Sequence, residues 1–376
     1  MSSELLDALT LLEKEKGISK EVLIEAIEAA LISAYKRNFN QAQNVRVDLN
    51  LEAGTMRVFA RKEVVDEVFD RRLEISLDEA RSINPNYQIE DALEVEVTPK
   101  NFGRIAAQTA KQVVTQRVRE AERGVIYSEF MDREEDIMTG IVQRLDSKFI
   151  YVSLGKIEAL LPANEQMPNE RYKPHDRIKV YITKVEKTTK GPQIFVSRTH
   201  PGLLKRLFEV EVPEIYDGTV EIKSVAREAG DRSKISVHSD NSEVDPVGSC
   251  VGPKGQRVQA VVNELKGEKI DIVRWSEDPV IFVANALSPS KVIDVIVDEV
   301  EKATTVIVPD YQLSLAIGKR GQNARLAAKL TNWKIDIKSE SEARESGVYP
   351  REQSGFFEEL LDEEEDTFDF HSEENE

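Results

Sequence analysis

The sequence predicts a multidomain α+β protein, and three observations lead to this fold class. The chain has 376 residues, more than one ordinary domain holds. Five short strand-like runs follow one another within residues 136–200, and a helix–turn–helix–strand pattern occurs twice within residues 247–337. We expect a helical, α+β amino-terminal domain at residues 1–130, a small β-barrel at 135–200, two related domains at 201–278 and 279–345, and a disordered acidic tail at 346–376.

The first predicted element of the amino-terminal region is a helix that begins after Ser19. Serine is a typical capping residue, and apolar residues recur at helical spacing from Leu23 to Ala34. Residues 45–51 and 55–60 then alternate apolar and polar side chains on either side of a Glu-Ala-Gly-Thr sequence, which is typical of a β-hairpin.

A long helix ends the amino-terminal region. We expect it to open at Asn101 and to reach about Phe130, after a strand at residues 93–97. The helix is rich in Ala, Gln and Arg, so its polar face is wide. Such a face either binds a partner or is simply solvated, and the sequence does not decide between these interpretations.

The predicted barrel has five strands, with turns at Leu-Asp-Ser and Leu-Gly-Lys. Their order and spacing resemble the S1-type OB-fold, a small barrel that binds oligonucleotides. The expected strands are residues 137–142, 149–154, 157–161, 178–185 and 194–197.

The duplicated pattern is the most informative feature of the sequence. In each copy, apolar residues at positions i, i+3 and i+4 lead into a Gly-x-x-Gly turn, and a second amphipathic helix and a Lys-Ile-Asp-Ile strand follow. The two turns are Gly252–Gly255 and Gly318–Gly321. Because the apolar spacing, the turn and the strand recur together, the pattern is far more specific than a lone pair of glycines.

A glycine turn between two helices suits a sugar-phosphate backbone. The first amide groups of the second helix have no partner within that helix and attract phosphate, and glycine lets the strand approach without meeting a Cβ atom. This arrangement resembles the KH domain, whose Gly-x-x-Gly loop clamps about four nucleotides of single-stranded RNA. The candidate RNA-binding residues are Gly252, Lys254, Gly255 and Arg257 in the first copy, and Gly318, Lys319, Arg320, Gly321, Arg325 and Lys329 in the second.

The competing interpretation is a helical hairpin whose glycines only allow close packing. Two copies, each with a basic residue in its turn, favour phosphate binding over that interpretation. Pro253 leaves the first turn with one cation, whereas the second turn has two, so we expect the second turn to bind phosphate more strongly. Strands are expected before each helix pair, an order that resembles the bacterial, type II KH fold, at residues 219–225, 235–238, 292–297 and 305–308.

The barrel supplies a second set of RNA-binding candidates. Tyr151, with Phe149 nearby, falls where S1-type domains stack a base, and Lys148 and Arg198 are candidates for contact with phosphate. Pro162 stands where many RNA-binding members of that class have a histidine. Because an aromatic residue on a small barrel is equally often part of the core, both interpretations of Tyr151 and Phe149 stay open.

The negative charge of the chain is concentrated at its carboxyl-terminal end. Residues 340–376 carry −13 of the formal net charge of −18, so the rest of the chain is nearly balanced and its cations can cluster locally. The acidic tail is either a solubilising segment or a competitor of RNA for the basic loops.

No catalytic constellation is visible in the sequence. The four histidines have no metal-ligand spacing with Cys250, the single cysteine, which occupies an apolar helical position and is better interpreted as a small core residue. Neither a nucleotide-binding phosphate loop nor a nucleophile elbow is present. We therefore expect no enzymatic activity, no cofactor and no metal. The chain also lacks a signal-peptide pattern and an apolar run of about 20 residues, so we expect a cytoplasmic protein.

The domain order and the motifs together resemble the NusA family of bacterial transcription factors, in a short, Gram-positive-like form without acidic repeat domains. The likeness covers residues 1 to about 345 and includes the stretches 101–108 and 197–201. It implies that residues 1–130 dock on RNA polymerase and that the three following domains bind nascent single-stranded RNA. It also implies roles in transcriptional pausing, intrinsic termination and antitermination, with other antitermination factors as partners. We expect a monomer that does not associate with membranes.

Two alternatives share the same modules. KH and S1-type domains also serve as accessory RNA-binding parts of phosphorolytic RNA-degrading enzymes, but there the KH domain comes first and large catalytic domains precede it. A ribosome-associated RNA-binding protein is the other alternative. Co-purification with RNA polymerase or with ribosomal subunits would distinguish these functions.

Overall fold

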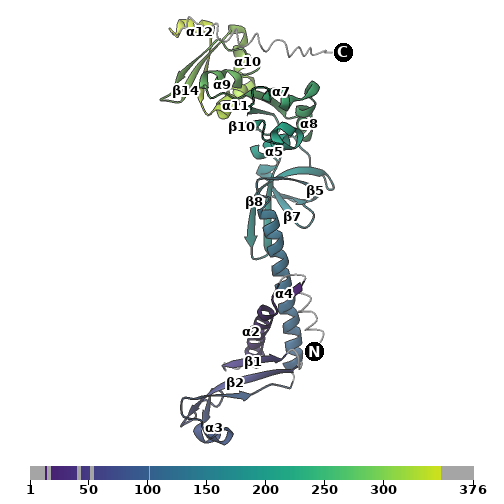
Figure 1. Cartoon of the computed structure of the whole chain (residues 1–376), viewed down its shortest axis with the longest axis vertical. Coiled ribbons are helices and arrows are strands. Elements are labelled where there is room, and N and C mark those ends of the chain that lie inside the picture. Colours follow the sequence, from purple (N-terminus) through teal and green to yellow (C-terminus); the bar gives the residue numbers. More distant parts are fainter. Residues whose placement is uncertain (1–12, 15–17, 40–43, 51–54, 101, 349–376) are drawn as a thin grey trace. The chain divides into compact units, whose positions relative to one another are not determined.

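The computed structural model describes residues 13–14, 18–39, 44–50, 55–100 and 102–348. The chain forms two compact units. The first contains residues 1–129 together with 187–192, and the second contains residues 130–186 together with 193–376. Helices and strands carry the labels of Figure 1.

The first unit packs two helices against a four-stranded sheet. Helix α2 (Lys20–Phe39) begins where the sequence predicts, and the N–H of Val22 donates to Oγ of Ser19 at 3.4 Å. The predicted hairpin and the later strand are also confirmed, as the antiparallel strands β1 (Val45–Asn50) and β2 (Thr55–Val65) and as β4 (Ala92–Glu96). The hairpin turn and Asn101 lie outside the described residues.

Two short elements of this unit are not predicted by the sequence. Strand β3 (Glu74–Ser76) pairs in parallel with β2, and α3 (Leu77–Ile83) follows directly, with Ser76 as its capping residue. The predicted long helix is α4 (Phe102–Met131). Its first turns bury Phe102, Ala106 and Ala110 in the core of the unit.

The predicted five-stranded barrel is confirmed in the second unit. Its strands are β5 (Ile137–Leu145), β6 (Phe149–Ser153), β7 (Glu158–Pro162), β8 (Arg177–Thr188) and β9 (Gly191–Ser197). They close in the order β5-β6-β7-β9-β8, with β8 antiparallel to β5. This closure leaves no free sheet edge and gives the barrel a fixed outer surface.

Two domains of the same topology follow the barrel, here called the first and second KH units. The first comprises α5 (Pro201–Glu211), α6 (Pro213–Tyr216), β10 (Glu221–Glu228), β11 (Arg232–His238), α7 (Pro246–Val251), α8 (Gln256–Glu264) and β12 (Lys269–Arg274). The second comprises α9 (Pro279–Ala286), β13 (Asp294–Asp298), β14 (Ala303–Val308), α10 (Leu313–Ile317), α11 (Gln322–Thr331), β15 (Lys334–Ser339) and α12 (Glu340–Glu345). In each, one antiparallel and one parallel pairing build a three-stranded sheet, as the predicted type II order requires.

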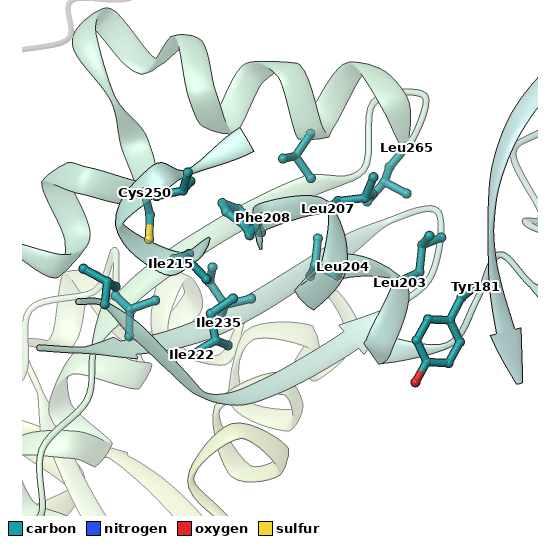
Figure 2. Close-up of a cluster of buried hydrophobic side chains, with 14 of the residues drawn as sticks. Tyr181, Leu203, Leu204, Leu207, Phe208, Ile215, Ile222, Ile235, Cys250 and Leu265 are labelled. Atoms are coloured by element: carbon teal, nitrogen blue, oxygen red, sulfur yellow. The ribbon is translucent and has the colours of Figure 1, made fainter. Parts of the chain in front are cut away.

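Helix α5 fills the core of the first KH unit. Figure 2 shows its residues Leu203, Leu204, Leu207 and Phe208 in one cluster with Cys250, and all five are buried. The prediction that Cys250 is a core residue is therefore confirmed, and burial raises the pKa of its thiol to about 12.

The two KH units share a continuous interface. Ala226 and Val273 of the first KH unit belong to the apolar core of the second KH unit. Lys234, which is fully buried, donates from Nζ to the carbonyl of Ser288 at 2.7 Å and pairs with Asp271 at 3.0 Å. Because apolar packing and a buried charge both cross the junction, the units are held together as one body.

Candidate nucleic-acid interface

The two glycine turns adopt the same backbone conformation. Gly252 and Gly255 have φ angles of 73° and 71°, and Gly318 and Gly321 have φ angles of 74° and 71°. The residue before the second glycine is also left-handed in both copies, with φ of 52° at Lys254 and 55° at Arg320. The sequence repeat is therefore a structural repeat as well.

The first glycine of each turn is required by packing as well as by its φ angle. A Cβ atom at Gly252 would lie 2.6 Å from Cγ of Arg257, and one at Gly318 would lie 2.8 Å from Cβ of Asn323. The second glycines differ, because a Cβ at Gly321 would meet nothing closer than 4.0 Å. The second glycine therefore leaves open space at the position where a strand could approach.

The helices behind the turns begin without a side-chain cap. Neither Gly255 before α8 nor Gly321 before α11 offers a capping oxygen, whereas Asp245, Asp278 and Ser339 cap α7, α9 and α12. Uncapped amide groups at a helix start carry a partial positive charge and favour an anion.

The cations of the turns are exposed and make no side-chain hydrogen bond or ion pair with any residue that the structure describes. They are Lys254 in the first turn, and Lys319 and Arg320 in the second. Lys329 is exposed on α11, two turns further on. The hydrogen bond from Arg325, with smaller contributions from Gln322 and from the charge of Lys329, lowers the pKa of Glu228. The second loop thus has the higher density of positive charge, as its sequence predicts.

Carboxylates line a cavity beside the first turn and lower the affinity of that turn for an anion. It is lined by Gly252, Pro253 and Arg257 and by three carboxylates, those of Glu214, Glu243 and Asp245. The negative charges of these carboxylates repel phosphate. The two copies therefore share a backbone but differ in electrostatic character.

The arginines predicted on the second helices are engaged by carboxylates. Nη1 of Arg257 lies 2.9 Å from Glu214 and donates to the carbonyl of Ser249 at 2.6 Å. Nε of Arg325 lies 2.6 Å from Glu228. These pairs have no local sequence pattern, because each glutamate lies on an element distant in the chain.

Arg198 is a correction to the sequence interpretation. Its side chain is 1% exposed, so it cannot contact phosphate in this structure. The guanidinium pairs with Glu170 and Glu264 and donates to the carbonyls of Lys179 and Glu264. Arg198 therefore joins the barrel to α8 of the first KH unit and is not part of the RNA surface.

The barrel presents Tyr151 and Phe149 side by side on β6. Both are half-buried, and their rings meet edge to face with centroids 6.5 Å apart. The guanidinium carbon of Arg144 lies 3.3 Å from the Tyr151 ring centroid, and Tyr151 is the cross-strand partner of Arg144. Lys148 is exposed at the turn before β6. No sequence pattern predicts the contact of Arg144, because only the strand register places it opposite Tyr151.

Other sites are not evident within the described residues. No group of three or more His, Cys, Asp or Glu residues there could hold a metal ion. No helix in the same residues is long and apolar enough to span a membrane.

Four family models match successive segments of the chain between residues 4 and 345. Residues 4–124 match the NusA N-terminal domain, residues 131–197 the S1 RNA binding domain, residues 198–275 the NusA-like first KH domain, and residues 279–345 the NusA-like second KH domain. The chain is 87% identical over 352 residues to the transcription termination/antitermination protein NusA of Bacillus subtilis, covering 94% of this chain and 95% of that one. It is 80% identical over 364 residues to the protein of the same name from Halalkalibacterium halodurans, covering 97% and 95%.

Proposed function

Because the chain belongs to the NusA family of transcription termination/antitermination proteins, we propose that its second glycine loop, Gly318–Gly321, is its principal contact with nascent RNA. The observation that carries this proposal is an uncapped helix start, an open glycine and two exposed cations within four residues. The proposed RNA surface extends to Lys329 on α11, to the first loop at Gly252, Lys254 and Gly255, and to Lys148, Phe149 and Tyr151 on the barrel.

The proposed mode of binding is avidity along one strand. Each site binds a few nucleotides weakly, and their linkage in one body makes the later contacts intramolecular. Phosphate contacts should make the affinity fall with salt, by roughly 0.7 power of the salt concentration for each phosphate neutralised on a single strand.

We further propose that residues 1–130 bind RNA polymerase, so that the RNA-binding domains receive the emerging transcript. The family supports this role, and the separate core of the first unit is consistent with it. Other antitermination factors would join this complex, with the protein itself acting as a monomer.

The test of RNA binding is the substitution Gly321→Asp in the full-length chain. The site has room for the carboxylate, which lies where phosphate should bind, and the backbone strain of a side chain at this positive φ is matched in the control. Like-charge repulsion should weaken binding to single-stranded RNA by at least about tenfold. Gly267→Asp is the matched control, because Gly267 also has a positive φ and open space but lies at the opposite end of α8 from the first loop. Binding equal to that of the parent chain would show the assignment of the loop to be wrong.

The test of polymerase binding is retention from a cell extract. The full-length chain should retain RNA polymerase, and a chain that lacks residues 1–130 should not. Equal retention by both chains would move the polymerase site to the second unit.

A further inference from the structure

Acidic side chains of the first KH unit accept hydrogen bonds from the helix that follows the second glycine loop. Nε and Nη2 of Arg325 on α11 lie 2.6 and 3.3 Å from the two carboxylate oxygens of Glu228, at the end of β10. Nε2 of Gln322 donates to Glu228 at 2.9 Å and to Asp231 at 2.8 Å. The acidic turn between β10 and β11 is thus bound to the first turns of α11.

The same guanidinium is also bound to the loop itself. Nη1 of Arg325 donates to the backbone carbonyl of Arg320 at 3.2 Å. Arg320 has a left-handed backbone, which is unfavourable for a residue that carries a Cβ atom. A contact from outside the loop helps to hold this conformation. Arg325 therefore connects Glu228 of the first KH unit to a strained residue of the second loop.

The first glycine loop does not have this connection. Lys254 has the same left-handed backbone as Arg320. The residue that corresponds to Arg325 in the first copy is Gln259, and its Nε2 donates to Asn263 within α8 at 2.9 Å. The connection is therefore a property of the copy that carries two loop cations.

We propose that Arg325 is a positioning residue, which couples the docking of the first KH unit to the shape of the second glycine loop and so holds Lys319 and Arg320 ready for phosphate. This inference rests on the proposed RNA-binding function. Three of the five N–H groups of the guanidinium are engaged, two by the Glu228 carboxylate and one by the loop carbonyl, so in this proposal the half-exposed Arg325 acts through the loop and not by binding RNA itself.

The opposite role makes an opposite prediction. If Arg325 bound phosphate directly, Glu228 would compete with RNA for it, and removal of the carboxylate would strengthen binding. If Arg325 positions the loop, removal of either partner frees the loop and weakens binding. The sign of the effect of Glu228→Gln therefore distinguishes the two roles.

The experiment measures the affinity of the full-length chain for a fluorescently labelled single-stranded RNA of mixed sequence. Glu228→Gln and Arg325→Gln should each weaken binding by roughly two- to thirtyfold, the range expected for a residue in a coupling network. The double variant should be no weaker than either single variant, because both remove one connection. Arg325→Lys keeps the charge but loses the fork, so it should be as weak as Arg325→Gln.

Asp231→Asn is the matched control for Glu228→Gln. It removes one negative charge from the same turn, but Asp231 contacts Gln322 and does not contact Arg325. Its affinity should stay within about twofold of the parent chain. Amide hydrogen exchange of residues 318–321, measured without RNA, should quicken in Glu228→Gln and stay unchanged in Asp231→Asn.

Equal or tighter RNA binding by Glu228→Gln, or unchanged exchange in its loop, would overturn the positioning role. Lys319→Gln separates that failure from a failure of the proposed function. If Lys319→Gln binds RNA like the parent chain, the loop is not an RNA site and both ideas are lost. If Lys319→Gln loses affinity while Glu228→Gln gains it, the loop binds RNA and only the positioning role is rejected.

Discussion

Arg227 and Glu268 form a two-pronged ion pair in which neither side chain is exposed, with Nε and Nη2 lying 2.8 and 2.9 Å from the two carboxylate oxygens. The N–H of Gly230 and the hydroxyl of Ser233 donate to the same carboxylate. Nη1 of Arg227 donates to the carbonyl of His200 at 2.9 Å. These hydrogen bonds offset the cost of burying two charges, and they fix β10 to the turn before β12 and to the segment that leaves the barrel.

Glu268→Ala should strongly destabilise the first KH unit, because Arg227 would be left buried without its carboxylate partner. The expected loss is about 3–5 kcal/mol in the free energy of unfolding, measured by denaturant titration. Glu94→Gln is the comparison, because Glu94 and Arg46 form an exposed pair whose loss should cost at most about 1 kcal/mol. Similar losses from both variants would contradict this account of the buried pair.

The same carboxylate should make stability depend on acid. Burial alone would raise the pKa of Glu268, but the hydrogen bond and the charge of Arg227 and the bonds from Gly230 and Ser233 lower it below its ordinary value of 4.5. A carboxyl whose folded pKa is lowered contributes its full stabilisation above the unfolded pKa and loses it as the pH falls below that value. Glu268→Gln should therefore flatten the loss of stability below about pH 4.5, measured by the unfolding midpoint against pH.

The two glycines of the second loop should respond differently to alanine. Gly318→Ala places a Cβ 2.8 Å from Asn323 and also strains the backbone, whereas Gly321→Ala enters open space and strains the backbone alone. We expect a loss of roughly 1–2 kcal/mol for Gly321→Ala and a clearly larger loss for Gly318→Ala. Thermal unfolding of the two variants measures the difference, and the reverse order would refute the packing argument.

Tyr151 should contribute to RNA binding by stacking. Tyr151→Leu keeps an apolar side chain on the barrel but removes the ring, and the loss of one stacked base should weaken RNA affinity by about 1–3 kcal/mol. Tyr216→Leu is the control, because Tyr216 is an exposed tyrosine on α6, outside the proposed surface. If Tyr151→Leu lowers the unfolding midpoint but leaves the affinity of the folded protein unchanged, Tyr151 belongs only to the core.

Arg198 and Lys319 should differ in how their loss changes the salt dependence of RNA binding. Lys319→Gln should lower the slope of affinity against salt by about 0.7, the share of one phosphate contact. Arg198→Ala should instead reduce stability by about 3–5 kcal/mol, since Glu170 would be left buried without its partner. Below the unfolding transition, the slope of Arg198→Ala should equal that of the parent chain.

The elements that the sequence predicts correctly are those with a strong local pattern. The helix from Lys20, the five barrel strands and both glycine turns depend on nearby residues alone, so their spacing is sufficient. Helix α9 was missed because Pro279–Ala286 is apolar on all sides and has no period, although Asp278 followed by Pro279 is a typical helix start. Helix α5 was also not predicted, although it too begins with a proline, Pro201, directly after its capping residue His200.

The site was predictable in its backbone and less so in its side chains. Glycine spacing identified the loops because the conformation of a turn is local. The partners of Arg198, Arg257 and Arg325 include glutamates 28, 43 and 97 positions away, and such pairings arise only when distant segments of the chain pack together. A basic residue on a helix is therefore a weaker indication of RNA contact than one within the loop.

Nζ of Lys234, in the first KH unit, donates a hydrogen bond to the carbonyl of Ser288 in the second KH unit. A chain that ended between the two KH units would leave Lys234 without this carbonyl, with Asp271 as its remaining partner, and would expose Ala226 and Val273 to water. Neither KH unit can therefore be removed without exposing polar and apolar groups that the other unit covers.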